Sequence, residues 1–144
     1  MTNVSGSFSG SVVTQTLMSP YHQTGQQLQL AEVRGRQQSP DADWNDARLT
    51  YWGFADLLAG SGSQRGHYVN EHPGGDRDYG TFEGKVSVSG NDVVLEGTFT
   101  FAGGTGRYQG IRGKGTYRGR MISATEIEMS WSGAYELAAA GQAA

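Results

Sequence analysis

Apolar and polar residues alternate repeatedly along the chain, which is the pattern of half-buried β-strands. The alternation is clearest over residues 125–137, where one face carries Ile127, Met129, Trp131, Tyr135 and Leu137. Similar alternation predicts strands over residues 82–88, 93–101 and 116–121. Helical periodicity is nearly absent, so the sequence predicts an all-β fold.

The first half of the chain follows the same pattern less regularly. Residues 4–12 alternate and then lose phase at Val13, which predicts a β-bulge. Further strands are predicted over residues 28–38, 48–58 and 64–71, and the strand over 48–58 has apolar residues on both faces. This makes about eight strands.

The predicted connections are short and favour antiparallel neighbours. Residues 89–92 form a hairpin turn, and longer loops follow at 20–26, 39–46 and 73–78. No gap is long enough for the crossover helices of a parallel sheet. The sequence therefore predicts a single eight-stranded antiparallel closed β-barrel of calycin-like type, with a two-sheet sandwich as the alternative.

Composition supports one folded domain. The chain has 144 residues, of which 1–137 are predicted to form the barrel and 138–144 a flexible tail. It contains 23 glycines, which we expect to let the strands bend at barrel corners. Three Trp, seven Tyr and five Phe argue against disorder.

Charge and residue types exclude several functions. There is no cysteine, which removes disulfides, thiolate zinc sites and cysteine nucleophiles. The net charge of -3, without a basic cluster, argues against a nucleic-acid partner. No stretch is apolar enough to span a membrane and no secretory signal is visible, so we expect no membrane partner and a cytoplasmic location. No cofactor or metal motif is present.

One glycine-rich segment is distinctive. Residues 101–115 read FAGGTGRYQGIRGKG, preceded by QRGHYV at 64–69 and DYG at 78–80. Together, and in this order, these segments resemble motifs of the allene oxide cyclase and dirigent-protein barrels. The physical interpretation of residues 103–108 is a tight turn, allowed by glycine, that lays Arg107 and Tyr108 across one barrel end.

The resemblance implies a barrel with an apolar lumen, often trimeric, whose relatives cyclise or steer reactive lipid or phenolic intermediates. Small bacterial cyclase barrels belong to the same group. Such enzymes act mainly by holding one reactive conformer, which can contribute several kcal/mol. A homodimer or homotrimer is therefore expected, but no catalytic residue is transferred by position.

Polar residues on the predicted strands are candidate catalytic groups. Glu32 shares a face with Leu28 and Leu30, and burial in the lumen would make it an acid or base. In the alternative, Ala31 and Val33 face inward and Glu32 faces solvent. Asp56 lies on the same strand face as Trp52, so it too could point into the lumen or into solvent.

The strand over residues 64–71 carries a second polar group. His67 and Glu71 lie on one face, with Tyr68, Asn70 and His72 on the other. Whichever face is inward brings titratable groups into the barrel, so His67, Tyr68 and Glu71 are catalytic candidates. A metal site at this strand is disfavoured because His72 points away from His67 and Glu71. The alternative is an exposed polar strand.

A set of aromatic and thioether residues is expected to line the lumen or fill the core. Its members are Trp52, Phe54, Phe99, Tyr117, Met129 and Trp131. A wall of this kind suits an apolar or conjugated small molecule. We therefore expect a small-molecule isomerase or cyclase, with a ligand-binding barrel or a packed structural barrel as alternatives. A cavity of roughly 300 Å³ or more with convergent polar groups favours the enzyme, and a filled lumen the structural barrel.

Overall fold

The computed structural model describes residues 1–137, which form eight strands and one short 3₁₀ helix. The predicted tail at 138–144 lies outside the described residues. The elements are β1 (Thr2–Met18), β2 (Gln26–Gln38), β3 (Arg48–Leu58), β4 (Ser61–Glu71), β5 (Arg77–Ser89), β6 (Asp92–Gly104), η1 (Gly106–Tyr108), β7 (Arg112–Met121) and β8 (Glu126–Glu136). Within this range no helix has the length and apolar character needed to cross a membrane.

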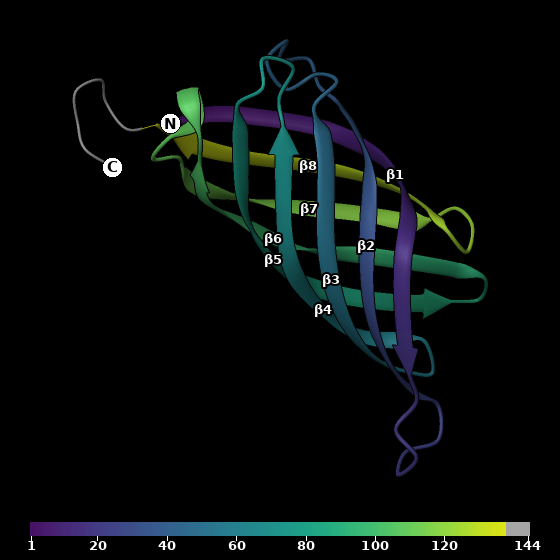
Figure 1. Cartoon of the computed structure of the whole chain (residues 1–144). Coiled ribbons are helices and arrows are strands. Elements are labelled where there is room, and N and C mark those ends of the chain that lie inside the picture. Colours follow the sequence, from purple (N-terminus) through teal and green to yellow (C-terminus); the bar gives the residue numbers. More distant parts are fainter. Residues whose placement is uncertain (138–144) are drawn as a thin grey trace.

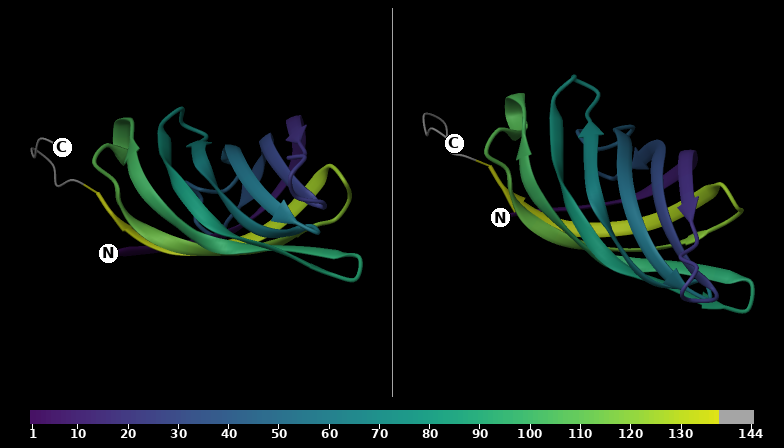
Figure 2. Two further views of the ribbon diagram at one scale, coloured as in Figure 1. Left: turned by 90° about the horizontal axis from the view of Figure 1, so that it is seen from below. Right: turned by 60° about the horizontal axis from the view of Figure 1, so that its bottom comes forward.

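The strands form a closed antiparallel barrel in chain order (Figure 1). Closure occurs between β1 and β8, which pair continuously from Thr2 opposite Tyr135 to Ser11 opposite Glu126. Figure 2 shows the strands curving around one central space, with the N-terminus at one end and the β5–β6 hairpin at the other. The predicted barrel is confirmed and the sandwich alternative is wrong, because the first and last strands are hydrogen-bonded neighbours.

Two local predictions are also confirmed. The register between β1 and β2 shifts between Val12 and Thr14, which is the bulge expected where the alternation loses phase. The turn between β5 and β6 uses Gly90 at a φ of 63°, a left-handed conformation that glycine adopts without a steric cost.

The two ends of the barrel differ in their connections. The hairpin end carries the β1–β2, β3–β4, β5–β6 and β7–β8 turns, and the η1 end carries the other three loops and η1. Near the hairpin end, Leu57, Val86, Leu95 and Ile127 belong to one buried cluster. At the η1 end, a second cluster gathers Val4, Trp44, Phe101, Tyr108, Ile111 and Tyr135.

The strand glycines also make room for side chains of neighbouring residues. Most strand glycines face inward, where a large side chain from a neighbouring strand takes the space of the missing Cβ. A Cβ on Gly66 would lie 2.8 Å from the Phe82 ring, and one on Gly84 would lie 2.6 Å from the Tyr117 hydroxyl. The glycines are therefore notches that allow a narrow barrel to hold several aromatic rings.

The notch at Gly35 can be tested by replacing it with alanine. The new Cβ would clash with the Ser9 carbonyl oxygen and with the Gly10 backbone, and neither backbone group can rotate away. We expect the free energy of unfolding of Gly35→Ala to fall by about 2 kcal/mol in chemical denaturation. The control is Gly74→Ala, where a Cβ meets nothing within 4 Å. Equal stability of the two variants would contradict the notch interpretation.

Candidate functional site

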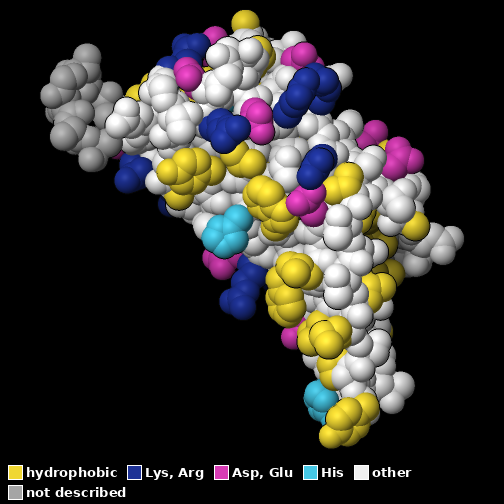
Figure 3. Space-filling model, viewed as in Figure 1, with side chains coloured by type: hydrophobic (Ala, Val, Ile, Leu, Met, Phe, Trp, Pro, Cys, Tyr) yellow, Lys and Arg dark blue, Asp and Glu magenta, His cyan; other side chains and the backbone are white. Residues whose placement is uncertain are grey.

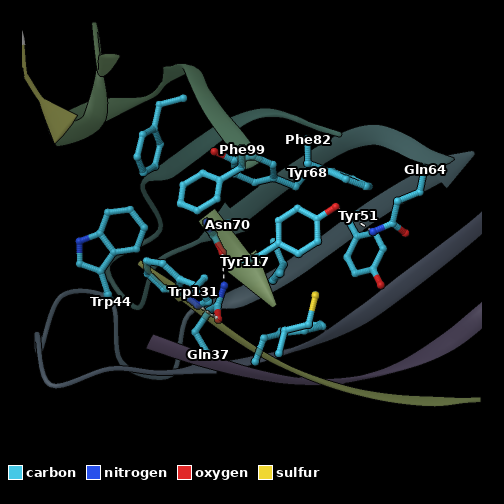
Figure 4. A pocket seen from close by; sticks show the side chains of 14 residues that line it. Gln37, Trp44, Tyr51, Gln64, Tyr68, Asn70, Phe82, Phe99, Tyr117 and Trp131 are labelled. Carbon is cyan, nitrogen blue, oxygen red and sulfur yellow. Dashed lines mark hydrogen bonds between the residues drawn. The ribbon is translucent and has the colours of Figure 1, made fainter. Parts of the chain in front are cut away.

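A narrow cavity of about 80 Å³ lies in the lumen, between mid-barrel and the underside of Trp44 (Figure 4). Its wall is mostly aromatic, and amide side chains from β2 and β4 add the polar groups. The lining residues are Phe8, Gln37, Trp44, Leu49, Tyr51, Gln64, Tyr68, Asn70, Phe82, Phe99, Phe101, Tyr117, Met129 and Trp131. The volume exceeds that of a single water site but is smaller than the roughly 300–1,000 Å³ of ordinary ligand pockets.

Five of the residues singled out from sequence line this cavity. They are Tyr68, Phe99, Tyr117, Met129 and Trp131, and they come from strands β4, β6, β7 and β8. Their rings meet edge to face: the ring centroids of Tyr68 and Phe99 are 6.1 Å apart, and those of Phe99 and Trp131 are also 6.1 Å apart. This geometry is favourable for aromatic pairs.

Four polar residues face away from the lumen, contrary to the inward orientation considered for them. In β2, Val33 is buried and Glu32 lies on the outer side, where it accepts a hydrogen bond from Trp52 Nε1 at 2.6 Å and pairs with Arg34 at 2.7 Å. In β4, the inward face begins at Gln64, so His67 and Glu71 are exposed. Asp56 is also exposed.

Trp52 and Phe54 are likewise outside the barrel, which corrects their expected place on the lumen wall. Trp52 is 42% exposed and Phe54 37% exposed, because Leu49 and Leu57 of the same strand face inward. With Leu30 of β2 they form an outer apolar patch, over which Arg65 packs at 5.9 Å from the Phe54 ring. Figure 3 shows apolar side chains scattered over this side of the molecule.

Tyr68 is the one candidate catalytic residue whose side chain lines the cavity. The side chain is 8% exposed, and its hydroxyl has no hydrogen-bond partner among residues 1–137. Burial, and then the nearby Asp78 carboxylate, raise the pKa of Tyr68 far above the ordinary value of 10.0. At neutral pH the group therefore keeps its proton and acts as a hydrogen-bond donor, not as a base.

A second tyrosine in the cavity is held by a partner. Gln64 Nε2 donates to the Tyr117 hydroxyl at 2.7 Å, and the hydroxyl sits in the notch made by Gly84 and Gly97. Burial raises the pKa of Tyr117 to about 12, against the lowering effect of the Gln64 hydrogen bond. Tyr117 therefore accepts a hydrogen bond that holds it in place, whereas the Tyr68 hydroxyl has no hydrogen-bond partner among residues 1–137.

A buried chain of hydrogen bonds runs from the cavity to the η1 end, and the sequence did not single it out. Trp131 Nε1 donates to Gln37 Oε1 at 2.8 Å, Gln37 Nε2 donates to Asn70 Oδ1 at 3.1 Å, and Asn70 Nδ2 donates to Asp78 Oδ2 at 3.3 Å. Because an indole can only donate, it fixes the orientation of both amides, and the chain ends on an acceptor. His72 Nε2 completes it, 2.6 Å from Asp78 Oδ1.

Asp78, at the end of this series of hydrogen bonds, is completely buried, with no exposed surface. Burial raises its pKa above 3.8, opposed by hydrogen bonds from His72 and Asn70. A signal for the chain was present in the sequence, because Asn70 and His72 share the face of Tyr68. Within the described residues no three His, Asp or Glu side chains gather as a metal site would require.

The barrel was compared with known proteins. No protein-family model matches the chain, and no curated protein sequence matches it significantly. Among solved structures, a pterocarpan synthase dirigent protein superposes with a TM-score of 0.54, covering 95% of this chain and 89% of the other at 12% identity. The fold is dirigent-like. At this identity the similarity establishes the fold alone, so the resemblance to allene oxide cyclases stays a prediction.

Proposed function

We propose that this dirigent-like barrel binds a small planar molecule in its lumen and restrains its conformation, as an isomerase or cyclase would. The observation that carries the proposal is Tyr68, which lines an aromatic cavity and whose buried hydroxyl has no partner among the described residues. An unpaired buried polar group costs about 1–3 kcal/mol, and a ligand that accepts its hydrogen bond recovers that cost. The name of the similar barrel, a pterocarpan synthase, supports action on a small organic molecule.

The chemistry of the wall defines the ligand class. Aromatic faces and Met129 favour a conjugated or aromatic ring system, and Tyr68 favours an oxygen acceptor such as a ketone. As a donor that keeps its proton, Tyr68 would stabilise negative charge that develops on that oxygen during rearrangement. The remaining contribution to the reaction rate would come from the aromatic side chains of the wall, which would hold the ligand in one conformation without acid or base catalysis.

The small volume sets a requirement on binding. A cavity of about 80 Å³ cannot hold a bicyclic molecule unless lining side chains move. Met129 has an unbranched, adaptable side chain, and Trp44 is carried by a loop and not by a strand. We therefore expect a ligand to bind by displacing side chains at the η1 end of the cavity. If no ligand binds, the alternative of a purely structural barrel is supported.

The test compares chromone, a bicyclic aromatic ketone, with naphthalene, which has a similar shape and no acceptor. We expect chromone to bind about 2- to 12-fold more tightly in NMR titration, since a net hydrogen bond contributes about 0.5–1.5 kcal/mol. Tyr68→Phe should remove this preference and leave the protein as stable as before, because the lost hydroxyl had no partner among residues 1–137.

Tyr117→Phe is the matched control, since it removes a second tyrosine hydroxyl of the cavity, one whose oxygen accepts a hydrogen bond from Gln64. It should keep the preference for chromone and lose about 1 kcal/mol of stability. If neither probe binds, the lumen is not a ligand site. If chromone and naphthalene bind equally to the wild-type protein, Tyr68 does not contact the ligand.

Self-association into a dimer or trimer stays a prediction. The outer patch of Leu30, Trp52 and Phe54 is where we place the contact, since large exposed apolar side chains that lie together often mark an interface.

A further inference from the structure

We propose that the β2–β3 loop, residues 39–47, is a gate over the lumen, and that one proton shared by His72 and Asp78 holds it closed. The inference rests on the proposed function, because it concerns entry to the same cavity. The residues that would control this entry lie at the η1 end of the barrel, and they are distinct from Tyr68 on the lumen wall.

Trp44 is the part of the loop that closes the barrel. It is 1% exposed and lies over the cavity, with its ring centroid 4.6 Å from that of His72, 5.6 Å from Tyr108 and 5.7 Å from Trp131. Figure 4 shows Trp44 at one end of the cavity and Gln64 at the other. Movement of this indole would open the lumen at the η1 end.

The loop is fastened to the barrel by His72. Its Nδ1 lies 3.0 Å from the backbone oxygen of Asp43, and its Nε2 lies 2.6 Å from Asp78 Oδ1. Tyr108 stacks against the ring at 4.1 Å between centroids, so the ring cannot turn freely. One imidazole thus connects a strand of the barrel wall to the gate.

Hydrogen-bond counting shows why a proton matters. A carbonyl only accepts, so Nδ1 must carry a hydrogen to bond with Asp43. The contact between Nε2 and Asp78 then needs a second proton, located on either atom. Without it, neutral His72 has one N–H for two acceptors, and the buried carboxylate is the stronger acceptor. Loss of the proton therefore releases the bond to the loop.

The direction of the pH effect follows from burial. The pKa of Asp78 is raised mainly by desolvation, so the protonated pair favours the closed, folded arrangement. That contribution is complete at low pH and is lost as pH rises through the raised value. The gate is thus expected to loosen as pH increases.

Other charged and titratable groups lie on the elements that adjoin the pair. From the adjoining strands, loops and η1 they are Asp41, Asp43, Glu71, Asp76, Arg77 and Arg107, with the phenols Tyr68, Tyr108 and Tyr135. The ion pair of Arg107 with Asp43, at 3.0 Å, is solvent-exposed and holds the loop independently of the shared proton. Trp44 Nε1, by contrast, is buried with no partner within the part of the chain that the structure describes, so opening satisfies it.

The experiment follows Trp44 by ¹⁹F NMR of protein labelled with 5-fluorotryptophan, titrated from about pH 5 to about pH 9. Trp44→Phe assigns its signal among the three tryptophans. The ratio of open to closed signal should rise by about tenfold per pH unit, as loss of one proton requires. The exposed Trp52 signal should not change in the same way. A Trp44 signal that stays constant across the range overturns the proposal.

Asp78→Asn is the decisive variant. Its amide nitrogen can donate to His72 Nε2 and its oxygen can accept from Asn70, so the latch is kept without a titrating proton. We expect this variant to stay closed at every pH tested. His67→Gln, an exposed histidine on the same strand, should behave as wild type. Titration of Asp78→Asn like the wild-type protein would contradict the latch.

The rate of chromone binding separates this inference from the proposed function. If binding speeds up in step with Trp44 opening, both are supported. If chromone binds at a rate that does not follow opening, the gate is wrong and the binding function stands. If Trp44 opens with pH but chromone never binds, the pH-dependent latch is supported and the binding function fails.

Discussion

Replacement of Trp44 by alanine is expected to lower the free energy of unfolding by about 3–5 kcal/mol, the usual cost of removing a buried aromatic side chain. The indole is fully buried and touches the rings of Phe101, Tyr108, Trp131 and Tyr135. No other residue of the β2–β3 connection, residues 39–47, has an aromatic side chain that could fill the space. Chemical denaturation followed by circular dichroism measures the loss.

Trp52→Ala is the matched control for this prediction. Trp52 is also a tryptophan but is 42% exposed on the outer wall, held mainly by its hydrogen bond to Glu32. We expect its loss to cost at most about 1.5 kcal/mol. If Trp44→Ala costs no more than Trp52→Ala, Trp44 is not a structural cap of the barrel.

The second large effect is expected from His72→Leu. Removing one partner of a buried pair usually costs about 3–5 kcal/mol, because the other charge stays buried without compensation. Asp78 would keep the hydrogen bonds from Asn70 and from its own backbone but lose that of His72, and its pKa would rise further. Protonation makes Asp78 neutral, so the destabilisation should be largest near neutral pH and smaller near pH 4.

Thermal unfolding of His72→Leu and wild type at a series of pH values measures this difference. His67→Leu is the control, since His67 is exposed on the same strand and its replacement should change stability by less than about 0.5 kcal/mol. A destabilisation by His72→Leu that does not depend on pH would mean that lost packing against Tyr108 and Trp44, and not the charge of Asp78, is responsible.

The sequence contained most of the information about the strands. Alternation near Ile127 and Trp131 predicted β8, and the loss of phase at Val13 predicted the bulge of β1. These predictions succeed because a strand with one buried face must alternate with period two, whatever its partners are. Short turns then allowed only antiparallel neighbours, and eight such strands close into a barrel.

Local alternation could not decide which face was inside where both faces carry apolar residues. In β3, Tyr51 and Trp52 are equally plausible core residues by sequence, yet only Tyr51 lines the lumen. In β2, Glu32 follows two leucines but lies outside because Val33, Gly35 and Gln37 pack inward. Pairing with neighbouring strands fixes the register of each strand. The register in turn decides, for all side chains of that strand together, which face the lumen and which face outward.

The candidate site depended on the tertiary structure even more strongly. His72 directly follows β4, Asp78 is the second residue of β5, and Trp44 lies within a loop, where no periodicity marks a buried residue. The sequence determined the barrel, its bulge and its supply of aromatic rings, because these follow from local alternation. Only the folded barrel decided which rings share the lumen and which buried groups meet at its end, because those contacts join residues from several strands and a loop.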